Sequence, residues 1–262
     1  MNAAPTVETR AWKLPAVAAL ALAALAYFFT AGESPRDRAL AQSAGAGTTR
    51  VQTTSNSRAK LSADQAVLLL VDHQAGLLSL VQDFGPDEFK NNVLALANTG
   101  KLFKLPTILT TSAETGPNGP LMPELRQLFP DAPYIARPGQ INAWDNEDFV
   151  KAVKATGRKQ IIIAGVVTDV CVAFPVLSAL DEGFEVFVVV DASGTFNTAV
   201  RDAAITRMAH AGAIITNWFA VACELKRDWR SGDGPAPLAE LLGNHIPAYR
   251  NLIVSHQAQT QR

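Results

Sequence analysis

The sequence has few cysteines, no long run of basic residues and no histidine spacing typical of a metal site. Cys171 and Cys223 are the only two cysteines, so a disulfide scaffold and a structural zinc site are excluded. A net charge of -1 with no Lys/Arg cluster argues against nucleic acid as a partner. The four histidines are scattered, without a His-x-His or HExxH pair. We therefore expect no metal, no cofactor and no nucleic-acid partner.

A long uncharged stretch lies near the N-terminus. Eighteen residues from Leu14 to Ala31 carry no charge, with Arg10 and Lys13 just before them. A helix of that length spans about 27 Å, enough for a short membrane crossing and long for the apolar core of a signal peptide. Residues 1–41 are therefore predicted to be either a signal peptide, cleaved after Ala41, or an uncleaved membrane anchor. Both alternatives predict export, to the periplasm or to the inner membrane facing it.

Beyond this segment the composition changes twice. Residues 42–60 are rich in Ser, Thr, Gly and Ala and are predicted to form a flexible linker. From residue 61 to residue 256, short apolar runs alternate with helical patterns, which is typical of βαβ units and a parallel sheet. Residues 257–262 are expected to be a C-terminal tail. The pattern predicts one α/β domain behind an N-terminal segment.

The apolar runs and the helical patterns have definite places in the sequence. Strands are predicted at residues 66–71, 106–111, 133–136, 160–164, 185–190 and 213–216, of which 133–136 is the weakest. Helices are predicted at residues 89–105, 146–156, 172–182 and 199–210. Three of these helices end at Gly157, Gly183 or Gly212, where a left-handed C-cap costs little.

Polar residues that follow the carboxyl ends of parallel strands line the ligand crevice of such a sheet. Asp72 follows the first predicted strand, and Cys171 follows the fourth after a glycine turn. Cys171 should lie in the first turn of a helix, where unpaired N–H groups and the helix dipole favour the nucleophilic thiolate. Asp72 would be the general base for that thiol and the acid that returns its proton. The alternatives are that Cys171 is a buried structural cysteine and that the Asp72 carboxylate caps a loop. Cys223 does not follow a strand and a glycine turn in this way and is interpreted as structural.

The residues around Asp72 and Cys171 resemble a known signature. An Asp after an apolar strand and the string Gly165-Val-Val-Thr-Asp-Val-Cys171-Val resemble the isochorismatase-like cysteine hydrolase superfamily. The resemblance covers residues 61–256, and the stretches 137–144 and 222–229 resemble its YcaC-type branch. It implies a three-layer, Rossmann-like α/β fold with a six-stranded parallel sheet and helices on both faces. It also implies a homo-oligomer, for which an octamer is one candidate.

The resemblance also implies the parts of an active site. These are an Asp-Lys-Cys triad, a non-proline cis peptide beside Gly165-Val166-Val167, and an oxyanion hole formed by the N–H groups of Val167 and Cys171. Where the lysine is implied, on the strand before Asn142-Ala143-Trp144, this sequence has Arg137. An arginine does not release its proton at any useful pH, so Arg137 can hold Asp72 and favour the thiolate by charge but cannot shuttle a proton. A surface position for Arg137 would leave the triad incomplete.

The presence of Cys171 favours an amide-type substrate. Relatives that cleave the vinyl ether of isochorismate lack the cysteine, whereas attack on an amide or carbamoyl carbon needs a nucleophile. The sequence thus predicts hydrolysis of a small amide or carbamoyl C–N bond through a thioester on Cys171. Asn142, Trp144, Thr168 and Phe174 are candidates to shape the substrate pocket, although residues of these types are more often core or capping residues than substrate contacts. Two alternatives are a non-catalytic oligomeric binding protein on the same fold and a nucleotide-binding oxidoreductase, whose G-x-G-x-x-G is missing after the first strand.

Overall fold

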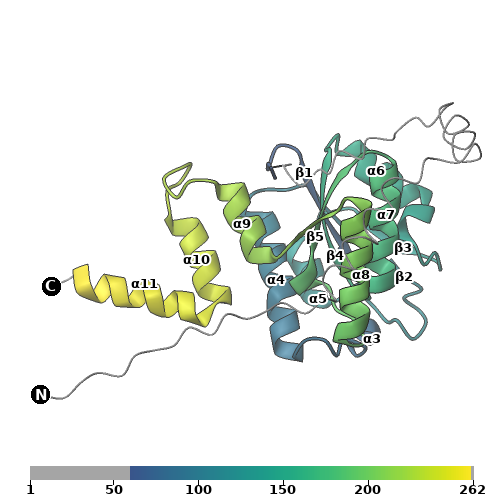
Figure 1. The fold of residues 1–262 in the computed structure, drawn as a ribbon, viewed down its shortest axis with the longest axis horizontal. Coiled ribbons are helices and arrows are strands. Elements are labelled where there is room, and N and C mark those ends of the chain that lie inside the picture. The colour runs from purple at the N-terminus through teal and green to yellow at the C-terminus, as the bar shows by residue number, and fades with distance from the viewer. Residues whose placement is uncertain (1–59, 261–262) are drawn as a thin grey trace, which may run out of the picture. The chain divides into compact units, whose positions relative to one another are not determined.

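The computed structural model describes residues 60–260 and is built on one sheet (Figure 1). Its strands are β1 (Ala66–Val71), β2 (Thr107–Ser112), β3 (Tyr134–Arg137), β4 (Gln160–Gly165), β5 (Glu185–Val189) and β6 (Ile214–Thr216). Every predicted strand matches an observed one to within one residue at each end, including the weak third strand. The predicted signal peptide or anchor and nearly all of the predicted linker lie outside the described residues and stay predictions.

The sheet has the order β3-β2-β1-β4-β5-β6, and all neighbouring strands are parallel. The predicted six-stranded parallel sheet is therefore confirmed. The chain runs outward from β1 to β3 and then returns to β4 on the other side of β1. Such a reversal leaves a crevice at the carboxyl ends of the two central strands. The candidate site is expected there, after β1 and β4.

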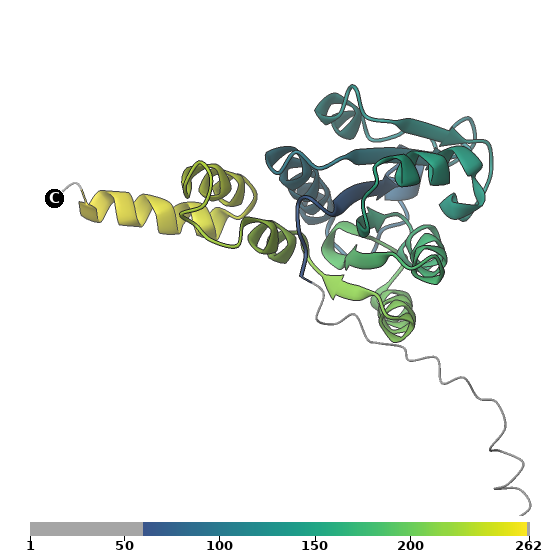
Figure 2. The same ribbon diagram turned by 90° about the horizontal axis from the view of Figure 1, so that it is seen from above.

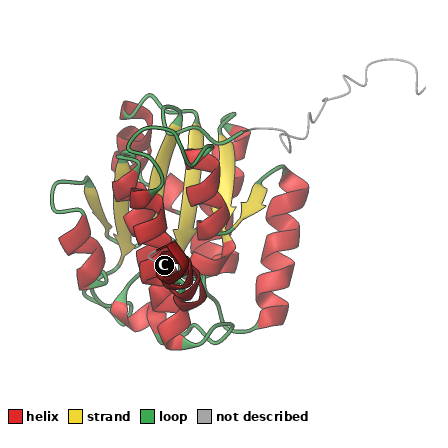
Figure 3. Cartoon of the chain, turned by 90° about the vertical axis from the view of Figure 1, so that its left-hand side faces the viewer, coloured by secondary structure: helices red, strands yellow, loops and turns green. Residues whose placement is uncertain are grey.

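Helices cover both faces of the sheet (Figure 3). Leu68 and Leu70 of β1 pack into one core, and Val67 and Leu69 pack into the other, because successive side chains of a strand point to opposite faces. The first face carries α3 (Ala75–Leu78), α4 (Pro86–Leu102) and α5 (Pro123–Leu128), with α9 (Trp218–Lys226) and α10 (Ala236–His245) packed against α4. The second face carries α6 (Glu147–Ala155), α7 (Ala173–Asp181) and α8 (Thr198–Ala211). The predicted three-layer arrangement is confirmed.

The four predicted helices correspond to α4, α6, α7 and α8. α4 begins at Pro86, earlier than predicted, because proline suits the first helical position, where no acceptor is needed for an N–H. Gly157, Gly183 and Gly212 have φ of 69°, 84° and 107°, as expected of left-handed residues at or just after helix ends.

The helices that follow β6 were not predicted from the sequence. α11 (Pro247–Thr260) continues through residues 257–260, which were expected to belong to a tail. Tyr249, Leu252 and Ile253 have helical spacing, but residues 255–260 are mostly polar, so the periodic stretch is too short to indicate a helix of this length. Within residues 60–260, no helix combines the length and the apolar character needed to cross a membrane.

Candidate active site

The two central strands bring Asp72 and Cys171 to the same crevice. Val71 at the end of β1 pairs with Gly165 at the end of β4. Asp72 follows directly, with a left-handed backbone (φ 56°) and its N–H bonded to the Thr110 carbonyl at 2.9 Å. Cys171 lies in a π-helical turn, Thr168–Val172, that continues into α7. The predicted position of the cysteine in the first turn of a helix is confirmed.

A π-helical turn begins the helix that carries Cys171. The Val167 carbonyl accepts the N–H of Val170 at 3.3 Å and the N–H of Val172 at 3.2 Å. Pro175 has no N–H to offer the Cys171 carbonyl, so a regular α-helical bond cannot form at that point. The N–H of Cys171 therefore belongs to the irregular first turn of the helix.

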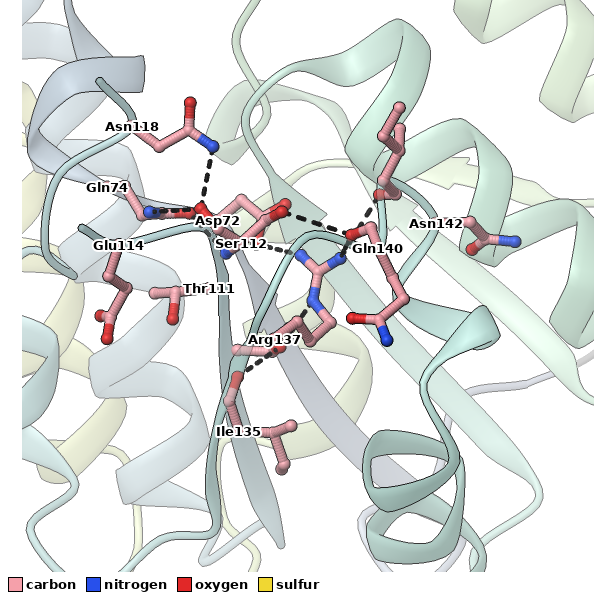
Figure 4. A network of polar contacts seen from close by, with 12 residues as sticks. Asp72, Gln74, Thr111, Ser112, Glu114, Asn118, Ile135, Arg137, Gln140 and Asn142 are labelled. Carbon is pink, nitrogen blue, oxygen red and sulfur yellow. Dashed lines mark hydrogen bonds and ion pairs between the residues drawn. The ribbon is translucent and has the colours of Figure 1, made fainter. Parts of the chain in front are cut away.

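Asp72 forms a buried ion pair with Arg137. The Asp72 side chain is fully buried, and Arg137 at the end of β3 is 1% exposed. Nη2 of Arg137 donates a hydrogen bond to Oδ1 of Asp72 (Figure 4). The alternative of a surface arginine is wrong, since a buried guanidinium needs a partner of opposite charge. Arg137 therefore occupies the place beside Asp72 that the resemblance implies for lysine.

The Arg137 guanidinium is held on all sides. Nε donates to Thr110 Oγ1 at 3.0 Å, and Nη1 donates to the carbonyls of Gln140 and, at 3.4 Å, Ile141. Thr110 in turn donates its hydroxyl hydrogen to the Ile135 carbonyl at 2.8 Å. With every nitrogen engaged, the guanidinium is fixed in position against Asp72 (Figure 4). Its available contribution is a positive charge rather than a transferable proton.

The thiol of Cys171 is protonated at rest. Burial raises the pKa of Cys171 to about 12, and the neighbouring Asp72 carboxylate raises it too, whereas the Val167 N–H and the charge of Arg137 lower it. The expectation that the helix N-terminus favours a resting thiolate is therefore wrong, because the thiol lies too deep and too close to a carboxylate. A base must remove its proton when it reacts.

Asp72 is placed to be that base. Burial raises the pKa of Asp72, and Arg137 and the Cys171 thiol oppose that rise. Oδ1 is occupied by Arg137, while Oδ2 is buried and has no hydrogen-bond partner. The Cys171 thiol lies close enough to the carboxylate to lower the pKa of Asp72. Oδ2 is thus the carboxylate oxygen with a lone pair available for the thiol proton.

The turn before Cys171 offers hydrogen-bond donors near the sulfur. The peptide bond between Val166 and Val167 is cis, as the resemblance implies. The backbone N–H of Val167 donates toward the sulfur of Cys171 and lowers the pKa of the thiol. The N–H of Cys171 lies in the same turn. The oxyanion hole that the resemblance implies at Val167 and Cys171 stays a prediction.

Thr168 and Phe174, both candidates for the substrate pocket, have different surroundings. Thr168 is fully buried next to Val167; its N–H bonds to the Gly194 carbonyl at 3.0 Å, and its hydroxyl has no partner. Phe174 on α7 packs under the guanidinium of Arg207 from α8, 5.6 Å from the ring centre. Thr168 therefore has an unused polar group beside the candidate oxyanion hole, whereas Phe174 is engaged with a neighbouring helix.

The other two pocket candidates, Asn142 and Trp144, are engaged with neighbours outside the triad. Asn142 accepts the Trp144 N–H at 3.0 Å and donates to Ser178 Oγ at 3.1 Å, and Figure 4 shows its amide turned away from Arg137. The Trp144 indole donates to Glu182 at 2.9 Å, and its ring lies edge-on to the rings of Phe149 and Phe184. Their roles as substrate contacts stay predictions.

Two polar residues that support the site were not predicted. Thr110 holds Arg137, as described above. Gln74 ties the end of β1 to the end of β2: its amide oxygen accepts the Ser112 N–H at 2.8 Å, and its amide nitrogen donates to the Ser112 carbonyl at 3.0 Å (Figure 4). Gln74 follows one predicted strand and Thr110 lies near the end of another, and these positions are what the sequence offers to link them to the site. Their partners depend on strand register and on loop paths, which the sequence does not display.

His73 and Cys223 lie apart from this chemistry. His73 is fully buried and bonds to the Ala192 carbonyl at 3.0 Å, and burial lowers its pKa to about 4. Cys223 lies on α9, and burial alone raises its pKa. Among residues 60–260, no three His, Cys, Asp or Glu side chains gather as metal ligands.

Comparison with known proteins identifies close relatives. A family model described as the isochorismatase domain matches residues 66–219. The probable hydrolase YcaC of Escherichia coli (strain K12) is 67% identical over 204 residues, which cover 78% of this chain and 97% of that protein. A solved structure of YcaC from Pseudomonas aeruginosa, with hexane-2,5-diol and covalent acrylamide, is 70% identical with a TM-score of 0.75 and covers 76% of this chain and 98% of that one. The E. coli YcaC structure is described as an octameric hydrolase of unknown specificity. It is 69% identical with a TM-score of 0.75, and the match covers 77% of this chain and 98% of that one.

Proposed function

This chain belongs to the isochorismatase family, and we propose that it hydrolyses a small amide or carbamoyl C–N bond through a thioester on Cys171. One observation carries the proposal: the buried Asp72 carboxylate, fixed by Arg137 and with one oxygen vacant, lies beside the Cys171 thiol, toward which the Val167 N–H donates. Relatives of the YcaC type are described as hydrolases, which supports the same reaction class for this chain.

The first half of the reaction forms the thioester. Asp72 Oδ2 takes the proton of Cys171 as the sulfur attacks the carbonyl carbon, and the carbonyl oxygen becomes negative. The N–H groups of Val167 and Cys171 stabilise that oxygen, and Arg137 keeps Asp72 in place. The C–N bond then breaks, and the leaving nitrogen receives the proton from Asp72.

The second half returns the enzyme to its starting state. Water attacks the thioester carbon while Asp72 takes one of its protons, and the C–S bond breaks to release the acid. Asp72 then returns the proton to the Cys171 sulfur. Over both halves, one amide or carbamoyl compound and one water give one acid and one amine or ammonia, and Arg137 keeps its proton throughout.

The Pseudomonas relative contains covalent acrylamide, which supports a nucleophilic atom in proteins of this type. Acrylamide carries both an amide and an electrophilic alkene, so its capture is compatible with an amide-sized pocket. The octameric E. coli relative supports a homo-oligomer for this chain as well. The alternative is an oligomeric binding protein without catalysis. It would have the same nucleophilic atom, pocket and oligomer, and would differ in that it turns over no substrate.

Release of ammonia separates the two functions. The purified full chain is incubated with a panel of primary amides and carbamoyl compounds, beside Cys171→Ala and, as a matched control, Cys223→Ala. We expect at least one compound to yield ammonia with the wild type and with Cys223→Ala but not with Cys171→Ala. Release that survives in Cys171→Ala would contradict the cysteine mechanism, and no release from any compound would favour the binding protein.

The N-terminal segment supports a proposal about location. The uncharged run from Leu14 to Ala31 is expected to direct the domain across the cytoplasmic membrane. Fractionation of cells expressing the full chain tests this. We expect recovery in the periplasmic or membrane fraction, whereas a cytosolic protein with its N-terminus intact would contradict the proposal.

A further inference from the structure

We propose that Gln74 is a positioning residue for the reaction: its side-chain amide holds Asp72 outside the sheet, where the carboxylate meets Arg137 and Cys171. The inference rests on the hydrolysis proposed above and adds a residue that the mechanism does not use. Gln74 is fully buried, two residues after Asp72. Within residues 60–260, its amide bonds to backbone groups alone, which belong to β2 and to the loop after β2.

The strand that carries the catalytic base leaves the sheet at Asp72. β1 lies inside the sheet, between β2 and β4, and Figure 2 shows it (dark blue) among the later strands. Its register with β2 ends at Val71, and Asp72 turns the chain with a φ of 56°. That left-handed backbone is unfavourable for a residue with a side chain, so the contacts around it must hold it. β2 nevertheless continues to Ser112.

The turn at Asp72 takes two backbone groups away from Ser112. The Asp72 N–H bonds to the Thr110 carbonyl at 2.9 Å, as in a regular parallel ladder. If the ladder continued, the Ser112 N–H would donate to the Asp72 carbonyl, and the N–H of residue 74 would donate to the Ser112 carbonyl. Instead, the Asp72 carbonyl accepts the Gln74 N–H at 2.7 Å. The turn therefore uses both of the groups that the next two ladder bonds need.

The Gln74 side chain supplies both groups. Its amide oxygen accepts the Ser112 N–H at 2.8 Å, and its amide nitrogen donates to the Ser112 carbonyl at 3.0 Å (Figure 4). A glutamine amide has the acceptor and the donor of a peptide group, so it replaces the missing stretch of strand. Ser112 is buried, and without the amide its N–H would need the Asp72 carbonyl as in a regular ladder. Asp72 would then return to an extended backbone, which withdraws its carboxylate from Arg137.

The same amide fixes the loop of residues 113–121, which follows β2. The Gln74 amide nitrogen also donates to the Gly119 carbonyl at 2.6 Å. The loop packs backbone against backbone on the segment after Gln74, because a methyl group added to Gly76 would lie 2.0 Å from the Pro117 oxygen. Loops that follow the strands of a parallel sheet line its crevice. Gln74 therefore couples the wall of the crevice to the catalytic base.

A second buried glutamine has similar contacts at the other end of the sheet. Gln160 begins β4, at the end opposite the crevice. Its amide oxygen accepts the Ser62 N–H at 2.8 Å, and its nitrogen donates to the Lys60 carbonyl at 3.0 Å and to Glu185 Oε2 at 2.8 Å. Loss of this amide should lower stability without moving Asp72. Gln160 is therefore a matched control for Gln74.

Three variants of the full chain test the proposal: Gln74→Met, Gln74→Glu and the control Gln160→Met. For each, kcat and KM are measured from pH 5 to pH 10 on the compound that releases ammonia most rapidly, and thermal unfolding reports stability. Alkylation of Cys171 by iodoacetamide, followed by mass spectrometry, supplies a rate that needs no substrate. In that reaction the sulfur displaces iodide and Asp72 takes the thiol proton, so the rate also depends on the position of Asp72.

We expect Gln74→Met to lower kcat and the rate of alkylation about ten- to a hundredfold, with little change in KM, since a misplacement of about 1 Å can have that effect. Gln160→Met should leave both rates unchanged at a similar loss of thermal stability. The contrast between the two variants separates a positioning role from a purely structural one.

Gln74→Glu replaces the amide with a group of the same shape. A buried carboxyl group that faces two carbonyls keeps its proton at neutral pH, so it still accepts from Ser112 and donates to one of the carbonyls. This variant should be nearly as active as the wild type at neutral pH. It should lose activity in alkaline solution, where the new carboxyl group ionises and the wild-type rate stays level.

Equal kinetic losses in Gln74→Met and Gln160→Met, or a Gln74→Met protein with unchanged rates, would overturn the positioning role. If Gln74→Met does not fold, the pH profile of Gln74→Glu decides: an alkaline loss supports the role, and a level profile overturns it. A wild type that hydrolyses no compound would overturn the proposed function, whereas the alkylation rates would still decide the role of Gln74.

Discussion

Cys171 and Cys223 are both half-buried, yet their neighbours differ. Cys171 lies beside Asp72 and within the field of Arg137, and both groups change its pKa. For Cys223, burial is the single cause of its raised pKa. Neither cysteine is a thiolate at rest, so a low pKa does not distinguish the nucleophile here. The difference lies in the base and the backbone donors that Cys171 can use when it reacts.

The largest expected effect comes from removing each sulfur in turn. Cys171→Ala should lower kcat for C–N hydrolysis by about four decades or more, as loss of a covalent nucleophile does in other hydrolases. Cys223→Ala should keep kcat within about twofold, because no described catalytic group touches it. Steady-state kinetics on the best compound of the panel measures both. Equal losses would remove the distinction between the two cysteines.

The second prediction concerns the positive charge of Arg137, which affects the pKa of Cys171 but not that of Cys223. Arg137→Met leaves Asp72 buried without its partner, a change worth about 3–5 kcal/mol, or roughly two to three decades in rate if most of it acts on the transition state. Arg137→Lys keeps the charge and should retain activity. The comparison requires kcat/KM for the three proteins. If Arg137→Met matches the wild type, Arg137 is not the substitute for the lysine that the resemblance implies.

The pH dependence of hydrolysis should follow Asp72 on the acid side. Burial raises the pKa of Asp72 above its ordinary value of 3.8, and a protonated Asp72 cannot accept the thiol proton. Activity should therefore fall about tenfold per pH unit as pH drops through that raised value. On the alkaline side the thiol adds no limb near neutral pH, because its pKa is about 12.

Arg137→Lys introduces a cation that can lose its proton at high pH. A lysine ammonium releases its proton near or below its usual pKa of about 10.4, so the variant should lose activity on the alkaline side where the wild type does not. Rate profiles from pH 4 to pH 10.5 would record both limbs. A wild-type loss of activity as pH rises from 7 to 9 would mean that a group other than Asp72 and Cys171 controls the reaction.

The smallest effect concerns the hydroxyl that positions Arg137. Thr110→Val removes a hydrogen bond to a charged donor, worth about 1.5 kcal/mol, and should lower kcat roughly tenfold with little change in KM. Thr99→Val is a matched control, because Thr99 is also fully buried and bonds only to the Ala95 carbonyl, at 2.8 Å, within α4. We expect Thr99→Val to lower the free energy of unfolding without changing kcat. Similar kinetics for both variants would assign Thr110 a purely structural role.

Much of this site follows from the sequence because it depends on strand ends. Asp72 and Cys171 could be predicted since apolar runs locate β1 and β4, and polar residues past parallel strands meet in one crevice. The partner role of Arg137 came from a resemblance, because nothing in its local sequence indicates burial. The state of the thiol could not be predicted, since a helix N-terminus is visible in the sequence whereas depth and a neighbouring carboxylate are not.

The contacts that complete the site escaped prediction for similar reasons. Thr110 reaches Arg137 because β2 and β3 pair in one register, and Gln74 reaches Ser112 across β1 and β2. Such partners are set by register and by loop paths. α11 escaped because the helical spacing of Tyr249, Leu252 and Ile253 covers little more than one turn and residues 255–260 are mostly polar.

Mass spectrometry of the protein during turnover tests whether Cys171 forms a thioester with the substrate. The full chain is mixed with the best amide or carbamoyl compound, quenched in acid within the first turnovers, and digested. We expect an added acyl or carbamoyl mass on the peptide that contains Cys171. The added mass should be absent from the Cys223 peptide and should be lost when the quench is delayed until the substrate is consumed. Turnover that leaves the Cys171 peptide unmodified at every time, or that modifies Cys223 instead, would contradict the thioester mechanism.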